Sequence, residues 1–155
     1  MGRKQRTLYK VVNLVVDTNI VFSTLLNPHS VVGEILMNIQ DRFTFFAPEL
    51  LKEELKKYSP KISAYSKLNQ HDLASVEALL FSTITFVAQE LISDQSWMKA
   101  YALTKDVDED DTPFVALGIE LNARLWTGDK VLSKGLSKKG SDITITTADL
   151  SKHLK

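Results

Sequence analysis

Short apolar runs alternate with longer amphipathic stretches along this chain of 155 residues. Continuous apolar runs of this kind are typical of parallel strands, which are buried on both faces of a sheet. The predicted strands cover residues 14–16, 43–47, 84–87, 124–126 and 143–146. The chain therefore has the strand pattern of an α/β protein.

The segments between these runs carry apolar residues at the three- and four-residue spacing of helices. Helices are predicted at about residues 20–26, 31–39, 48–58, from 72, from 94, 112–121, 131–136 and from 147. Thr18 or Asn19 can cap the first helix, Ser30 the second and Thr147 the last. Pro48 suits the first helical position. Residues 61–70 are polar and receive no element, and 59–95 could be a helical insertion.

Strands that alternate with helices favour βαβ units and a mainly parallel sheet. The fold class expected is α/β, with three layers in which helices cover both faces of the mainly parallel sheet. The sequence shows no internal repeat and no linker, so a single domain over residues 1–155 is expected. Residues 1–10 are polar and basic, and we interpret them as a flexible lead-in.

The composition of the chain limits the kinds of partner, site and location to expect. Lysine plus arginine and aspartate plus glutamate both number 19, so bulk charge does not indicate a nucleic-acid partner, which would need a local basic patch. Cysteine is absent, which excludes disulfides and thiolate metal sites and fits a cytoplasmic location. No apolar run approaches the roughly 18 residues of a membrane span, so no membrane association is expected.

Acidic residues follow two of the predicted strands and precede one helix. Asp17 ends the first strand, and Asp129 follows the fourth. Asp111 ends the run Asp108-Glu-Asp-Asp and stands directly before a helix, with Asp108 as a further ligand or a supporting group. Acids at the carboxyl ends of parallel strands lie where open α/β sheets bind ligands.

A fourth acid is predicted within the helix over residues 48–58. Glu54 has leucines and a tyrosine three and four positions away, so it borders the buried stripe. Glu53 has Glu49 and Lys57 at those positions and faces solvent. Glu54 is therefore the better candidate, although a choice one residue off stays open.

Each acid also has a structural interpretation. Asp17 can cap a helix, Asp129 can be a turn residue, and the acidic loop can favour the helix dipole. Thr18 and Asn19 could cap without an acid, and a single acid would suffice for the helix dipole, whereas the loop carries acids at 108, 110 and 111. The three histidines are scattered along the chain, so we expect them at the surface rather than together in a metal site.

Clustered carboxylates repel one another unless a cation binds them. Oxygen ligands suit Mg²⁺ or Mn²⁺, and such ions support hydrolysis of phosphodiesters. An acidic pocket would repel nucleic acid, and lysines around its rim could offset that repulsion. The candidates are Lys52, Lys56, Lys57, Lys61, Lys67, Lys130, Lys134, Lys138 and Lys139.

Three segments together resemble the PIN-domain family. They are Val15-Val-Asp-Thr-Asn19, the helix from Pro48 to Tyr58, and the block from Asp108 to Lys130. The resemblance covers both ends of the chain well and residues 59–95 poorly. It implies a Rossmann-like, PIN-type three-layer α/β/α sandwich. It also implies a ribonuclease that depends on Mg²⁺ or Mn²⁺ and cleaves single-stranded RNA.

The resemblance also implies roles for individual residues and partners. Asp17, Glu54, Asp111 and Asp129 would be the catalytic, metal-binding quartet, with Asn19 or Thr127 as polar support toward the substrate. Many small prokaryotic members are toxins of toxin–antitoxin pairs, so an antitoxin protein and a homodimer are possible partners.

Two other interpretations remain open at this point. A PIN-like module could bind RNA or protein without cutting, because an acidic quartet is necessary but not sufficient for cleavage. A phosphotransferase such as a response-regulator receiver fits less well, since no lysine-bearing strand follows in the order that a receiver needs.

Overall fold

A five-stranded sheet forms the centre of the computed structural model, which describes residues 10–39 and 41–154. Every pairing between neighbouring strands is parallel. The strands are β1 (Val12–Val16), β2 (Phe43–Pro48), β3 (Ile84–Val87), β4 (Arg124–Trp126) and β5 (Thr144–Ile145), in the order β3-β2-β1-β4-β5. All five apolar runs are therefore confirmed as strands.

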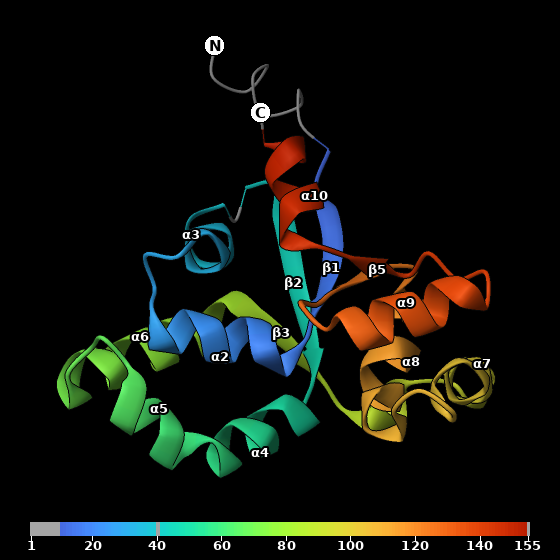
Figure 1. Cartoon of the computed structure of the whole chain (residues 1–155), viewed down its shortest axis with the longest axis horizontal. Helices are drawn as coiled ribbons and strands as arrows, with labels where there is room; N and C mark the ends of the chain where they lie inside the picture. The colour runs from blue at the N-terminus through green and yellow to red at the C-terminus, as the bar shows by residue number, and fades with distance from the viewer. Residues whose placement is uncertain (1–9, 40, 155) are drawn as a thin grey trace.

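Helices cover both faces of this sheet (Figure 1). One face carries α2 (Thr18–Leu26), α3 (Val31–Asn38), α4 (Leu50–Lys57), α5 (Ser59–Tyr65) and α6 (Gln70–Thr83). The other face carries α7 (Asp94–Thr104), α8 (Thr112–Leu121) and α9 (Lys130–Lys138). Two 3₁₀ turns, η1 (Gln89–Leu91) and η2 (Glu109–Asp111), precede α7 and α8, and α10 (Thr147–His153) follows β5. The predicted three-layer sandwich is confirmed.

Strand β1 is the middle strand of the sheet, and helices bury it from both sides. Leu14, Val15 and Val16 are at most 1% exposed, which explains the continuous apolar run. In the same core, Phe45 of β2 packs against Trp126 of β4 with ring centroids 5.9 Å apart. This packing fixes the carboxyl end of β1, where Asp17 follows.

The strand order places a topological switch point between β1 and β4. The chain leaves β1 toward β2 and leaves β4 toward β5, in opposite directions across the sheet. Connections that diverge in this way open a crevice beyond the carboxyl ends of the two strands, which is where such sheets bind ligands. Asp17 and Asp129 follow these two strands.

Residues 59–95, the segment that the sequence left least certain, contain two helices and the edge strand β3. The helix predicted over residues 48–58 ends before Ser59, as expected, since α4 ends at Lys57. Ser59 and Pro60 also open α5, which was not predicted, and a proline in the first turn costs no hydrogen bond there. Pro48 was expected to begin a helix and is the last residue of β2, so that boundary was wrong.

Several helix caps also differ from the prediction by one residue. Asp17, not Thr18 or Asn19, occupies the N-cap of α2. Thr146, not Thr147, caps α10 and forms a capping box with Asp149. Ser30 caps α3 as predicted, through the N–H of Gly33.

The lead-in over residues 1–10 lies outside the described residues except for Lys10, which is exposed. Among the described helices, none alone has the length and apolar character of a membrane span. Helices α2 and α3 reach those values only when taken together, across a bend of 106°.

Candidate metal centre

A pocket of about 340 Å³ opens at the carboxyl end of β1. Six carboxylates line it, and they come from the end of β1, from α4, from the segment around η2 and from the start of α9. They are Asp17, Glu54, Asp108, Asp110, Asp111 and Asp129. The structure thus brings together the four acids that the sequence singled out, although up to 112 residue positions (from 17 to 129) separate them along the chain.

Asp17 is the most deeply buried of these acids, at 7% exposed. Its Oδ1 accepts a hydrogen bond from the Thr18 N–H at 2.7 Å, and its Oδ2 accepts one from Thr127 Oγ1 at 2.5 Å. Burial raises the pKa of Asp17, and the hydrogen bond from Thr127 opposes that rise. The side chain therefore caps α2 and lines the pocket at once.

Glu54 projects from α4 toward the same pocket. Thr18 Oγ1 donates a hydrogen bond of 2.5 Å to Glu54 Oε1, which ties α4 to the start of α2. Burial raises the pKa of Glu54, and the bond from Thr18 lowers it in part. Glu53 is exposed and does not line the pocket, so the helical-spacing argument chose the residue that faces the site.

Asp111 ends η2 and stands directly before α8. Its Oδ2 is buried and, among the described residues, has no hydrogen-bond partner. Burial raises its pKa to about 7, and the charges of Asp17, Asp108, Asp129 and Glu54 add to that rise. A buried oxygen without a partner is costly, and a bound cation would satisfy it.

Asp129 and Asp108 each combine a local structural bond with a place in the pocket. Asp129 caps α9, because its Oδ1 accepts the Leu132 N–H at 3.0 Å. Asp108 accepts the Asp110 N–H at 3.0 Å and begins η2. Both residues thus have a local structural role as caps, rather than as a turn residue or a helix-dipole charge, and that role does not exclude a second one.

Asn19 and Thr127 occupy different positions relative to the pocket. Asn19 is exposed and lines it, as a residue that contacts a substrate would. Thr127 is 1% exposed and does not line it. Its hydroxyl donates to Asp17 Oδ2 and accepts the Asp129 N–H at 3.0 Å. Thr127 therefore positions two acids and is too buried to touch a substrate.

Replacing Thr127 by valine should test this positioning role. Valine keeps the shape but leaves a buried carboxylate oxygen of Asp17 and the Asp129 N–H without their partner. We expect a loss of about 1–3 kcal/mol in the free energy of unfolding, measured by urea titration. Thr127→Ser keeps the hydroxyl and should lose less than half as much. A larger loss in Thr127→Ser than in Thr127→Val would show that the methyl contact, not the hydroxyl, matters.

The donor chemistry fits a hard divalent cation. All candidate ligands are carboxylate oxygens, as Mg²⁺ and Mn²⁺ prefer, and one of those oxygens is buried without a partner. In the described part of the chain, no three His, Asp or Glu side chains stand together as a finished ligand set. Asp17, Glu54 and Asp129 instead direct oxygens to Thr127, Thr18 and Leu132. The pocket thus contains candidate ligands, which are not preassembled around a common point in the described residues.

Sequence reasoning missed part of the pocket wall. Phe22, Tyr58 and Asp110 line it, and none of them was proposed for the site. Of the lysines proposed for a basic rim, only Lys61 lines this pocket. Lys52 and Lys56 line a second cavity instead. The spacing offered one signal, because Phe22 follows Thr18 by four residues and Tyr58 follows Glu54 by four, which places each pair on one helix face.

Comparisons with known proteins agree with this architecture. The family model described as the PIN domain matches residues 15–154. An uncharacterized protein of Methanocaldococcus jannaschii is 30% identical over 124 residues, which cover 78% of this chain and 73% of that protein. Among solved structures, VapBC2 of Rickettsia felis, bound to a DNA fragment from its promoter, matches with a TM-score of 0.57. That match has 17% identity over 87% of this chain and 97% of the other, so it shows a shared fold.

Proposed function

The chain belongs to the PIN-domain family, and from that membership we propose that it is a metal-dependent ribonuclease that hydrolyses phosphodiester bonds of single-stranded RNA. Asp17, Glu54, Asp111 and Asp129 would hold Mg²⁺ or Mn²⁺. The observation that carries this proposal is Asp111 Oδ2, which is buried without a partner in a pocket shared with these other acids. Such an arrangement costs folding free energy, and a cation that binds there offsets the cost.

The side chains of the pocket would divide the remaining work. A bound cation would supply positive charge to the phosphate and favour the ionised form of a nearby water. Thr127 and the Thr18 N–H hold Asp17 in a fixed orientation, and Thr18 Oγ1 does the same for Glu54. Groups held in place before the substrate arrives need no reorganisation during the reaction. Asn19 is exposed in the pocket, where its amide can donate to a phosphate oxygen.

A matched pair of neighbouring glutamates tests this function. Glu54→Gln removes a charge from the pocket, whereas Glu53→Gln removes the same charge from the exposed side of α4. With Mn²⁺ and a mixed-sequence single-stranded RNA, we expect Glu54→Gln to lower the initial cleavage rate by about 10²-fold or more. Glu53→Gln should stay within about twofold of wild type.

Two outcomes would contradict this assignment. Similar rates for both variants would remove Glu54 from the site. Absence of cleavage by the wild type, with RNA binding retained, would favour the alternative function, a non-catalytic PIN-like module that binds RNA or protein.

A cytoplasmic role as the toxin of a toxin–antitoxin pair is the second part of the proposal, with an antitoxin protein as partner. The likeness in fold to VapBC2 of Rickettsia felis supports it, together with the resemblance to small prokaryotic PIN toxins. Induced expression of the same two variants is the test. Wild type and Glu53→Gln should arrest growth and Glu54→Gln should not, whereas normal growth with all three would argue against a toxin.

A further inference from the structure

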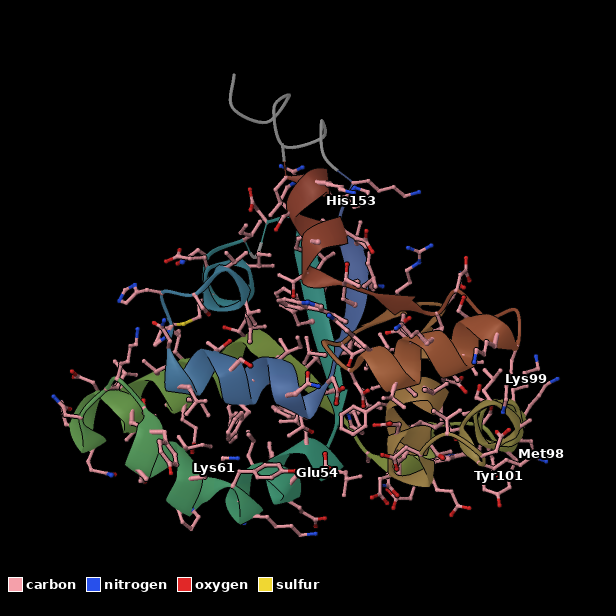
Figure 2. All side chains as sticks on the ribbon, in the orientation of Figure 1. Glu54, Lys61, Met98, Lys99, Tyr101 and His153 are labelled. Atoms are coloured by element: carbon pink, nitrogen blue, oxygen red, sulfur yellow. The ribbon has the colours of Figure 1, made fainter. Side chains whose placement is uncertain are left out.

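Part of the pocket lining is aromatic and basic, whereas most of the remaining lining is acidic. It consists of Phe22 of α2, Tyr58 at the end of α4 and Lys61 of α5, which we call the aromatic wall. The rings of Phe22 and Tyr58 meet edge to face, with centroids 5.5 Å apart and planes at 63°. Lys61 Nζ lies 5.9 Å from the centroid of the Phe22 ring. In Figure 2, the labelled Lys61 and Glu54 both lie between α2 and the α4–α5 segment.

The aromatic wall is connected through its helices to two of the acids, because α2 begins directly after Asp17 and α4 carries Glu54. Tyr58 follows Glu54 by four residues, and Phe22 follows Thr18, the hydrogen-bond partner of Glu54, by four. Tyr58 is 47% exposed even though it contacts Phe22, so part of its ring faces outward. The wall therefore presents an aromatic surface directly beside the carboxylates.

Charge restricts how a polyanion can reach this pocket. The six carboxylates repel phosphates, and Lys61 is the one cationic side chain among the residues that line it. Without a ligand its ammonium group rests near the Phe22 ring, a weak contact that a phosphate can replace. The approach of a nucleic acid is thus least unfavourable along the aromatic wall.

Single-stranded nucleic acids are bound by the same combination of groups, an aromatic platform for a base and a cation for the backbone. We propose that Tyr58, supported by Phe22, stacks on one base of a single-stranded RNA, while Lys61 binds a phosphate next to the cleaved bond. This inference rests on the proposed ribonuclease function and adds a nucleotide subsite to it. A base inside a duplex is already stacked on both faces, so the subsite selects single strands over duplexes.

Two substitutions in the wall and two outside it test the subsite. Tyr58→Leu removes the platform and Lys61→Gln removes the charge. Tyr65→Leu and Lys99→Gln are the matched controls, because both residues are exposed and neither lines the pocket. Tyr58→Phe keeps the ring and should behave like wild type, which separates stacking from a structural effect of the hydroxyl.

Binding of a fluorescent single-stranded RNA is measured by anisotropy in EDTA, and KM and kcat are measured in Mn²⁺. Tyr58→Leu should weaken binding about 5- to 100-fold and raise KM more than it lowers kcat. Lys61→Gln should reduce the slope of log affinity against log salt by about 0.7, as expected for one phosphate contact on a single strand. Both controls should stay within twofold of wild type, and duplex RNA should bind weakly to all variants.

The outcomes separate this inference from the proposed function. Cleavage by wild type, with Tyr58→Leu and Tyr65→Leu equal in binding and KM, would overturn the subsite alone. Binding that depends on Tyr58 without any cleavage would support the subsite and contradict the ribonuclease function. If wild type neither bound nor cleaved RNA, both proposals would be wrong.

Discussion

Replacing Asp111 by asparagine should make the metal-free protein more stable and, at the same time, nearly inactive. The carboxylate of the half-buried Asp111 has one buried oxygen without a partner among the described residues and other acids around it, so its charge costs free energy in the folded state. Asparagine removes the charge and offers an amide N–H to the neighbouring carboxylates. The same change removes a proposed metal ligand, and we expect RNA cleavage to fall by about 10²-fold or more.

The gain in stability should depend on pH in a defined direction. The pKa of Asp111 is about 7 in the folded protein, above its ordinary value of 3.8. Below about pH 4 the group is neutral in both the folded and the unfolded state, so it carries no charge penalty. The folded protein holds this proton more tightly than the unfolded chain does. As pH rises from about 4 through 7 the proton must be released, so the folded protein loses stability relative to the unfolded chain. The advantage of Asp111→Asn should therefore be near zero at pH 4 and largest at pH 8.

Thermal unfolding in EDTA measures this effect. Solvent screens the partly exposed group, so we expect a gain on the order of 1–2 kcal/mol at pH 8, or a few degrees in Tm. Mn²⁺ should stabilise wild type more than Asp111→Asn, because only wild type has the complete site. The exposed Asp41 supplies the control, and Asp41→Asn should change neither Tm nor its pH dependence. A variant less stable than wild type at pH 8 would contradict the burial of an unpaired charge.

Asp17→Asn should also abolish activity, but with the opposite effect on stability. Both oxygens of Asp17 accept hydrogen bonds, from the Thr18 N–H and from Thr127 Oγ1. An amide NH₂ must face one of these two donors, and Thr127 Oγ1 already accepts the Asp129 N–H. We expect a loss of about 1–3 kcal/mol in the free energy of unfolding, measured by urea titration. Greater stability of Asp17→Asn at neutral pH would show that its hydrogen bonds do not offset its burial.

The parts of the fold that the sequence predicts are those that local patterns determine. Leu14 to Val16 are buried on both faces, so the strand reads as an uninterrupted apolar run. Asp17 then stands out because a polar residue ends that run at the point where ligands bind. Glu54 was distinguished from Glu53 by helical spacing, since position on a helix face is a local property.

The remaining features depend on tertiary contacts that no local pattern encodes. Thr127 supports Asp17 across 110 residues of sequence, and a buried threonine after a strand gives no sign of that partner. Phe22, Tyr58 and Lys61 come from three helices and form one wall only after the chain folds. Helix α5 was missed because Ser59-Pro60 is as compatible with a helix start as with a helix end.

The initial rate of cleavage of a single-stranded RNA, compared between wild type and Asp17→Asn, tests the proposed metal-dependent ribonuclease most directly. Both proteins are assayed in Mn²⁺, in Mg²⁺ and in EDTA, with the metal restored at the end. Wild type should cleave with a divalent cation, stop in EDTA and recover with added metal, whereas Asp17→Asn should be slower by about 10²-fold or more with either metal. Equal cleavage by the two proteins, or cleavage that continues in EDTA, would contradict a catalytic metal centre at Asp17.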